Sequence, residues 1–301
     1  MKILITGGTG LLGKALVETN NSVRDITAVY IGNYAMQDGS SAKYIKADIC
    51  DKDAMGDIFA STIPDVVIHT AGAANVDFCE KNQASGRRAN VYGTEVITSL
   101  CKIYGSKMVF ISTNAVFDGK NAPYSEAAAP CPLNIYGKMK LEAEKIVSSS
   151  GLKYQIIRPI LMYGWNDERE RANPVTWLIN KLKNKETVNM VDDVYENPLF
   201  SNHCAEIIWA LIDKNKEGYY HVAGTDVVNR YQFAHIVAEI FGLDKNLVKA
   251  VPSSFFKDIA PRPANTSYST AKVEKDLNIK LPGLRKSLEL MKNMKGAGCP
   301  K

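Results

Sequence analysis

Residues 2–13 read KILITGGTGLLG, and this stretch decides the fold. The apolar, β-branched run before the glycines is typical of a buried strand, and the residues after it have helical periodicity. Gly7, Gly10 and Gly13 have the spacing G-x-x-G-x-x-G. The first allows a tight strand-to-helix turn, the second lets the backbone approach a diphosphate, and the third lets the helix pack closely on the strand. The segment therefore predicts a dinucleotide-binding turn whose helix directs free N–H groups at phosphates.

The first half of the chain alternates strand-like and helical segments with short connections. We expect strands at 2–6, 26–31, 43–46, 65–70, 107–112 and 153–158. We expect helices at 11–19, 53–61, 88–104 and 134–149. This alternation predicts an α/β fold with a Rossmann-type, doubly wound parallel sheet, because right-handed crossovers place helices on both faces. Pro159 is expected to end the last of these strands, because proline cannot continue a ladder.

The regular alternation of strand-like and helical segments ends after about residue 160. Helical patterns follow at 174–183, 203–214, 231–241, 269–277 and 284–294, with strand-like runs at 187–191 and 218–222. We expect residues 1–160 to form an NAD(P)-binding Rossmann domain. Residues 161–301 are expected to form mainly a smaller C-terminal α/β substrate lobe, with some elements returning to the first domain.

A second motif, YGKMK at 136–140, follows a strand-like run that ends in Ser112 and Thr113. Tyr136 and Lys140 are spaced i, i+4, so both face the same side of a helix. We expect the lysine ammonium, together with a nicotinamide charge, to lower the pKa of the phenol, which then exchanges a proton with a substrate oxygen. Ser112 or Thr113 is placed to hydrogen-bond the same oxygen, because ligands sit at the carboxyl ends of parallel strands. The two motifs together predict a nicotinamide-dependent oxidoreductase acting at an alcohol or ketone carbon.

The bulk composition disfavours several other classes of protein. The chain has 301 residues and a net charge of +5, without a run of more than two consecutive Lys or Arg. This distribution predicts no nucleic-acid and no membrane-binding patch. Six cysteines without a C-x-x-C pair, and four histidines not grouped with them, predict no metal site and no disulfide framework. Reduced thiols, a strand at the N-terminus in place of a signal peptide, and the lack of a long apolar run favour a cytoplasmic protein.

The residues that distinguish NAD from NADP are less clearly marked. The second expected strand ends VYIGN at 29–33, with no acid for a 2′-hydroxyl and no Arg for a 2′-phosphate. Asn33 suits either form, and Asp48 is placed to reach the adenine side. We therefore expect NADP(H) or NAD(H), with a slight preference for NADPH because no acid rejects it. For His69, a hydrogen-bonded core histidine is favoured over a cofactor contact.

These motifs resemble those of the extended short-chain dehydrogenase/reductase superfamily and, within it, the dTDP-4-dehydrorhamnose reductase branch. The resemblance is carried by ITGGTGLLG at 5–13, DVVIHTAG at 65–72, NVYGT at 90–94, ISTNAVFDG at 111–119 and NIYGKMKLE at 134–142. It implies an enzyme that reduces the 4-keto group of a dTDP-linked 6-deoxyhexulose with NAD(P)H. It also implies that the second lobe holds a nucleotide sugar. A homodimer is a family expectation, because helices such as 88–104 and 134–149 commonly pair subunits.

Together, the motifs and the resemblance assign expected roles to individual residues. The expected catalytic residues are Thr113, Tyr136 and Lys140. The expected cofactor-binding residues are Gly7, Thr9, Gly10, Leu11, Leu12, Gly13, Asp48, Ile49, Ala71, Gly72, Ala73, Asn90, Tyr136 and Lys140. The expected substrate-binding residues are Asn114, Asn173, Pro198 and Arg262. No metal ligand is expected.

One departure from the branch pattern keeps alternatives open. The branch commonly reads Ser-Thr-Asp-Tyr where this chain has STNA at 112–115, so a carboxylate and an aromatic hydroxyl are replaced at Asn114 and Ala115. The simplest inference is a different or relaxed sugar specificity. The same change argues against a 4,6-dehydratase, which needs an acid and a base after the threonine. Two alternatives to the reductase are a sugar-nucleotide epimerase with tightly bound NAD, and a non-catalytic regulatory subunit like the one this branch supplies to methionine adenosyltransferase.

Overall fold

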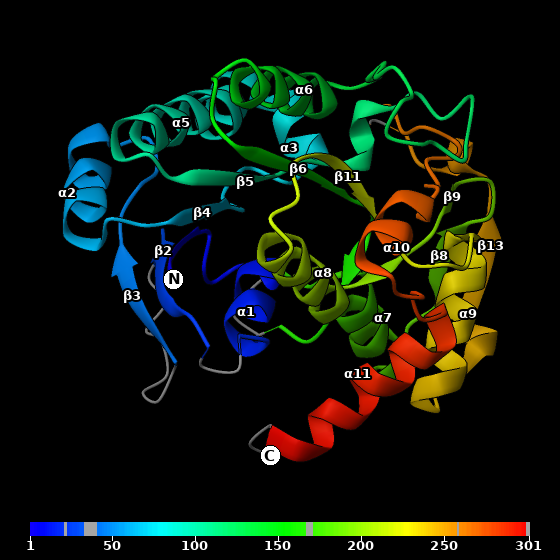
Figure 1. The fold of residues 1–301 in the computed structure, drawn as a ribbon. Coiled ribbons are helices and arrows are strands. Elements are labelled where there is room, and N and C mark those ends of the chain that lie inside the picture. Colours follow the sequence, from blue (N-terminus) through cyan, green and yellow to red (C-terminus); the bar gives the residue numbers. More distant parts are fainter. Residues whose placement is uncertain (21–22, 33–40, 167–170, 258, 299–301) are drawn as a thin grey trace.

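The computed structural model describes residues 1–20, 23–32, 41–166, 171–257 and 259–298. Its centre is a seven-stranded sheet with the order β11-β6-β5-β4-β1-β2-β3, in which every neighbouring pair is parallel (Figure 1). The strands are β1 (Lys2–Thr6), β2 (Asp25–Tyr30), β3 (Ala42–Lys46), β4 (Val66–His69), β5 (Lys107–Ile111), β6 (Tyr154–Pro159) and β11 (Gly218–Val222). The expected Rossmann-type sheet is confirmed.

Helices cover both faces of the sheet because successive side chains of a strand point to opposite sides. Ile3 and Ile5 of β1 belong to one apolar cluster, whereas Leu4 between them belongs to the other. The first cluster includes residues of α1 (Leu11–Glu18), α8 (Ser201–Asp213) and α10 (Ala271–Leu277). The second includes residues of α2 (Lys52–Thr62), α5 (Gly93–Tyr104) and α6 (Ile135–Ser148). The same two layers are visible in Figure 1.

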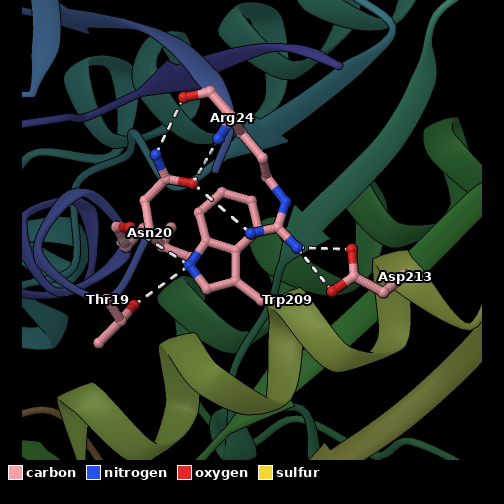
Figure 2. Close-up of polar contacts among 6 residues, drawn as sticks. Thr19, Asn20, Arg24, Trp209 and Asp213 are labelled. Atoms are coloured by element: carbon pink, nitrogen blue, oxygen red, sulfur yellow. Dashed lines mark hydrogen bonds and ion pairs between the residues drawn. The ribbon is translucent and has the colours of Figure 1, made fainter. Parts of the chain in front are cut away.

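Helix α8 comes from the second half of the chain but is fastened to the first helix. The Trp209 indole Nε1 donates to the Leu16 carbonyl at 3.2 Å and to Thr19 Oγ1 at 3.1 Å. The Arg24 guanidinium lies 4.5 Å from the centre of the Trp209 ring and forms an ion pair with Asp213 (Figure 2). Since β11 also joins the main sheet, the second half supplies part of both the sheet and its helical layer.

The rest of the second half forms a smaller lobe. Its apolar core is built from three helices and short strand pairs, with Tyr163, Leu178, Phe233 and Leu288 among the buried side chains. The helices are α7 (Pro174–Lys183), α9 (Arg230–Phe241) and α11 (Leu284–Gly298). The strand pairs join β7 (Met162–Tyr163) to β10 (Leu199–Phe200), β8 (Val188–Val191) to β13 (Val248–Val251) and β9 (Tyr195–Glu196) to β12 (Val228–Asn229). Within the described ranges, no helix combines the length and apolarity needed to cross a bilayer.

One detail differs from the expected elements, and one agrees with them. The segment expected as one helix over 88–104 begins with a π-helical turn at Arg88–Tyr92, and two short helices precede it, α3 (Val76–Lys81) and α4 (Gln83–Arg87). Such short elements carry too little periodicity to be found from sequence. Strand β6 includes Pro159, which pairs with Val222 of β11, whereas the ladder to β5 ends at Ile157. The expectation that Pro159 ends the strand is confirmed, since β6 stops at this residue.

Candidate active site

The glycine turn is closed so tightly that side chains do not fit in it. Gly7 has φ +74°, and its carbonyl accepts a hydrogen bond from the Gly10 N–H at 3.0 Å. A Cβ at Gly13 would lie 2.2 Å from the Gly7 carbonyl oxygen, and one at Gly8 would lie 2.6 Å from Ala28 Cβ. Helix α1 begins at Leu11 without a side-chain cap. Its first N–H groups are therefore available to an anionic ligand, and the cradle fits the diphosphate of a dinucleotide.

The expected wall of the cofactor site follows β4, and Asn90 braces it. The buried Asn90 amide accepts a hydrogen bond from the Ala73 N–H and donates one to the Ala73 carbonyl, both at 3.1 Å. A Cβ at Gly72 would lie 2.6 Å from Asn90 Oδ1, so this glycine allows the close approach. Asn90 lies in the π-helical turn, an irregularity often found at functional sites. The structure thus brings Asn90 against the 71–73 segment, where its expected supporting role requires it.

Asp48, which is expected on the adenine side of the cofactor, forms an ion pair with Arg88. Its carboxylate accepts hydrogen bonds from the Cys50 N–H and from Arg88, both at 2.9 Å. Although burial opposes the effect, these hydrogen bonds hold the Asp48 pKa below its usual range. Ile49 is buried against Gly93 of α5. No sequence motif indicated a role for Arg88 beside Asp48, and Asn33 lies outside the described residues.

Tyr136 and Thr113 meet at the carboxyl end of β5. Tyr136 is buried in the first turn of α6, and the Thr113 side chain lies near enough to its phenol to lower the phenol pKa. Thr113 Oγ1 also accepts a hydrogen bond from the Ala115 N–H at 3.1 Å, which fixes its orientation. Burial raises the Tyr136 pKa to about 12, against the lowering effect of Thr113. The direction is opposite to the one expected from the i, i+4 lysine.

The position of Lys140 explains this correction. Its buried ammonium donates to the Ile111 carbonyl at 2.7 Å and lies 4.0 Å from the centre of the Phe110 ring. Burial lowers the Lys140 pKa to about 7, and Glu144 acts in the opposite direction. Lys140 is not among the groups that shift the Tyr136 pKa. The shared helix face is as expected, but the ammonium is directed at the strand end and burial dominates the phenol.

His69 is part of the core beneath this site. Its ring nitrogens form hydrogen bonds with Thr6 Oγ1 at 2.6 Å and with Thr94 Oγ1 at 3.2 Å. Complete burial, assisted by the nearby Lys140 charge, lowers the His69 pKa to about 3. The interpretation of His69 as a neutral, hydrogen-bonded core histidine is confirmed.

Loops of the second half approach the catalytic end of β5. Asn114 Nδ2 donates to Thr266 Oγ1 at 2.7 Å, and Asn134 Nδ2 donates to the Pro261 carbonyl at 3.0 Å. Arg262 forms an ion pair with Asp77 of α3 at 2.9 Å. The structure therefore brings Asn114 and Arg262 to the same side of the molecule through the 260–266 segment, which no sequence motif indicated.

The other two expected substrate residues have structural partners. Asn173 is the N-cap of α7, where its side chain accepts from the Val175 and Thr176 N–H groups and donates to the Gly164 carbonyl. Its amide is thus engaged in holding the helix start. Pro198 packs beside Gly224, where a Cβ would lie 2.3 Å from the Pro198 carbonyl oxygen. Among the described residues, no group of three or more His, Cys, Asp or Glu could hold a metal ion.

The Rossmann sheet, the glycine cradle and the buried Thr113–Tyr136 pair beside Lys140 define an NAD(P)-dependent oxidoreductase of the extended short-chain dehydrogenase/reductase class. Comparison with known proteins is more specific. The chain belongs to the RmlD substrate binding domain family, whose model matches residues 1–295.

Individual relatives within this family carry two different names. The dTDP-4-dehydrorhamnose reductase of Aggregatibacter actinomycetemcomitans is 27% identical over 96% of this chain and 97% of that protein. Methionine adenosyltransferase 2 subunit beta of Danio rerio is 26% identical over 91% of this chain and 84% of that protein. The crystal structure of dTDP-4-dehydrorhamnose reductase from Bacillus anthracis in complex with NADP superimposes with a TM-score of 0.84 at 25% identity, covering 97% of this chain and 99% of that one.

Proposed function

We propose that this protein is an NAD(P)H-dependent reductase of a nucleotide-activated 4-keto-6-deoxy sugar. The observation that carries the proposal is the buried Tyr136, which lies beside Thr113 at the carboxyl end of β5. The parallel strands place this pair at the same edge of the sheet as the glycine cradle after β1. Relatives named dTDP-4-dehydrorhamnose reductase, one of them bound to NADP, supply the substrate and cofactor classes.

The residues of this chain have separate tasks in the reaction. The N–H groups at the start of α1 bind the cofactor diphosphate, and Asn90 holds the adjacent 71–73 segment in place. When bound, the nicotinamide cofactor supplies the hydride. Tyr136 donates its phenolic proton to the substrate carbonyl oxygen, and Thr113 hydrogen-bonds the same oxygen. Since burial keeps the Tyr136 pKa near 12, the phenol is protonated at neutral pH, as a proton donor must be.

Lys140 has the third task. Its ammonium, held at the Ile111 carbonyl, places a positive charge at the end of β5, one helical turn from Tyr136. The buried position of all three side chains excludes water from the proton transfer.

The substrate side supports a sugar specificity different from that of the reductase branch. Asn114 presents a neutral amide, and that amide is held by Thr266. The adjacent Ala115 offers no hydroxyl. A sugar recognised by this chain therefore forms fewer hydrogen bonds at this point than one recognised by Asp and Tyr.

A regulatory subunit is the second candidate function. It is favoured by the relatives named methionine adenosyltransferase 2 subunit beta, which align over 91% of this chain. The retained Thr113, Tyr136 and Lys140 favour the enzyme, because a subunit that only binds the cofactor does not need a proton donor.

The deciding experiment follows the absorbance of the reduced nicotinamide. Purified protein is mixed with NADPH or NADH and a dTDP-4-keto-6-deoxy sugar, beside a Tyr136→Phe variant. Cofactor oxidation that disappears in the variant supports the reductase and ranks the two cofactors. Bound cofactor without oxidation, and without interconversion of sugar epimers, would favour the regulatory role.

Compartment and assembly are also part of the proposal. We infer a cytoplasmic protein, because the five cysteines within the described ranges are all free thiols. We infer a homodimer paired through the α5–α6 side, as the resemblance implies. Light scattering of the purified protein measures its mass directly, and a monomer at micromolar concentration would refute the dimer.

A further inference from the structure

Three consecutive residues at the end of β5 each meet one residue on a single face of α6. The contacts are Thr113 with Tyr136, the Ile111 carbonyl with Lys140, and Ser112 with Glu144. The α6 residues are spaced four apart, so they lie in one row along the helix. The first two contacts belong to the proposed reaction, whereas the third has no assigned role.

Glu144 is a fully paired, buried anion. Its carboxylate accepts hydrogen bonds from Ser112 Oγ at 2.5 Å, Arg158 Nε at 2.8 Å and the second Arg158 nitrogen at 2.7 Å. The two side chains of the ion pair are 1% and 3% exposed. Burial works against the Arg158 charge, but the hydrogen bonds that Arg158 donates to Glu144 raise the Arg158 pKa.

Arg158 is itself held in one orientation. Its guanidinium lies 5.2 Å from the centre of the Phe117 ring and 4.8 Å from that of Tyr219. One nitrogen donates to His221 Nε2 at 3.3 Å, while His221 Nδ1 donates to the Tyr124 carbonyl at 3.0 Å. Burial and the Arg158 charge lower the His221 pKa to about 3, so His221 is neutral. Within the described ranges, Glu144 is therefore the carboxylate that forms an ion pair with Arg158.

We propose that Glu144 is a positioning residue of this site, whose carboxylate, fixed by Ser112 and Arg158, keeps Lys140 a charged ammonium at the end of β5. The role of that ammonium toward cofactor and substrate rests on the proposed function, but its charge state does not.

The surroundings of Lys140 leave this task to Glu144. On α6 it is flanked by the neutral phenol of Tyr136 and by Glu144. From β4 it faces His69, which is neutral, and from β6 Arg158 lies behind Glu144. Burial lowers the Lys140 pKa, and Glu144 is the group that raises it. Removing the carboxylate therefore releases the lysine proton at a lower pH.

The test titrates Lys140 directly in ligand-free protein. Lysine labelled with carbon-13 at Cε reports its own protonation by NMR, and a Lys140→Met variant assigns the signal. Glu144→Gln should lower the titration midpoint by about one pH unit or more, as expected for losing an opposite charge nearby. Because this variant leaves Arg158 buried and unpaired, the double variant Glu144→Leu with Arg158→Met removes both charges and keeps an apolar, folded interior. The double variant should shift the midpoint in the same direction but by less, because it also removes the positive charge of Arg158.

Glu142→Gln is the matched control. Glu142 lies two residues before Glu144 on α6, but it is 41% exposed and pairs with Arg87 at the surface. Its loss should leave the Lys140 midpoint unchanged. A Glu144→Gln variant that folds, by circular dichroism, and titrates Lys140 at the wild-type pH would overturn the proposal and leave Glu144 as a structural brace.

A second readout separates this proposal from the proposed function. The pH dependence of NADPH binding, followed by nicotinamide fluorescence, should lose its alkaline limb at a lower pH in the Glu144 variants than in the wild type. The titration midpoint of Lys140 could shift as expected although neither the wild type nor any variant binds NADPH. In that case the cofactor assignment fails, whereas the role of Glu144 stands.

Discussion

Replacing Gly13 by alanine tests whether the turn after β1 is shaped by close packing. In an ordinary helix this change stabilises, because alanine loses less backbone entropy than glycine, by about 0.5–1 kcal/mol. At Gly13 the new Cβ would lie 2.2 Å from the Gly7 carbonyl oxygen and 2.8 Å from Gly8 Cα, whereas ordinary contact begins at 3.4 Å. Both neighbours are backbone atoms, so no side chain is free to swing away.

The size of the effect follows from that overlap. Helix α1 and the turn must separate by roughly 1 Å, and overpacking of this kind costs about 1–3 kcal/mol. After the gain in helix propensity, Gly13→Ala should lower the free energy of unfolding by about 1–2 kcal/mol. The same displacement moves the N–H groups of α1 away from the diphosphate. Losing one charge-assisted hydrogen bond costs about 1.5–3 kcal/mol, so the Kd for the cofactor should rise at least about tenfold.

Gly56 supplies the matched control. It lies inside α2, and a Cβ there meets no atom within 4 Å. Gly56→Ala should therefore raise stability by about 0.5–1 kcal/mol and leave cofactor binding unchanged. Urea denaturation and a fluorescence titration with NADPH measure both quantities. If Gly13→Ala is stabilised like Gly56→Ala and binds the cofactor with the wild-type Kd, the reasoning about this turn is wrong.

Three further predictions concern other parts of the molecule. Asn90→Ala removes two hydrogen bonds to Ala73, so the KM for the cofactor should rise several-fold while a cofactor-free melting curve shifts little; an unchanged KM would contradict the brace. His221 has a folded pKa of about 3, below its unfolded value near 6.5, so its contribution to stability is present above about pH 6.5 and is lost as the pH falls toward 3. His221→Asn should reduce the fall of the urea midpoint between about pH 7 and pH 5, and an unchanged slope would refute this. Trp209→Ala should cost about 3–5 kcal/mol of unfolding free energy, since it empties the α1–α8 contact; chemical denaturation checks this, and a loss below about 1 kcal/mol would show that the contact contributes little.

Much of the fold was predictable because its signals are local. The strand–glycine–helix pattern of residues 2–13 specifies a turn whose requirements are met within a dozen residues, and the structure shows β1 and α1 at the expected places. The i, i+4 spacing of Tyr136 and Lys140 likewise specifies a shared helix face, since helical geometry alone determines it.

Properties that depend on burial were not predictable in this way. Burial raises the pKa of Tyr136 in the ligand-free protein, whereas the expected lowering includes a nicotinamide charge; this desolvation depends on neighbours such as Cys79 of α3. Asn173 caps α7, a contact set by the local backbone, and its place at the substrate stays a prediction. Neither the burial of Tyr136 nor the capping contact of Asn173 can be predicted from residue types alone.

The sequence by itself determined the class of sheet, the phosphate cradle and the identity of the residues on the catalytic face, because each follows from spacing within one or two adjacent elements. Only the tertiary structure decided which distant partners complete them. Glu144 contacts Ser112 and Arg158, which come from other elements of the chain. Strand β11 joins the main sheet and α8 packs on it, although both come from the second half of the chain. Burial is a property of the whole packed molecule, and it lowers the pKa of Lys140 and raises the pKa of Tyr136.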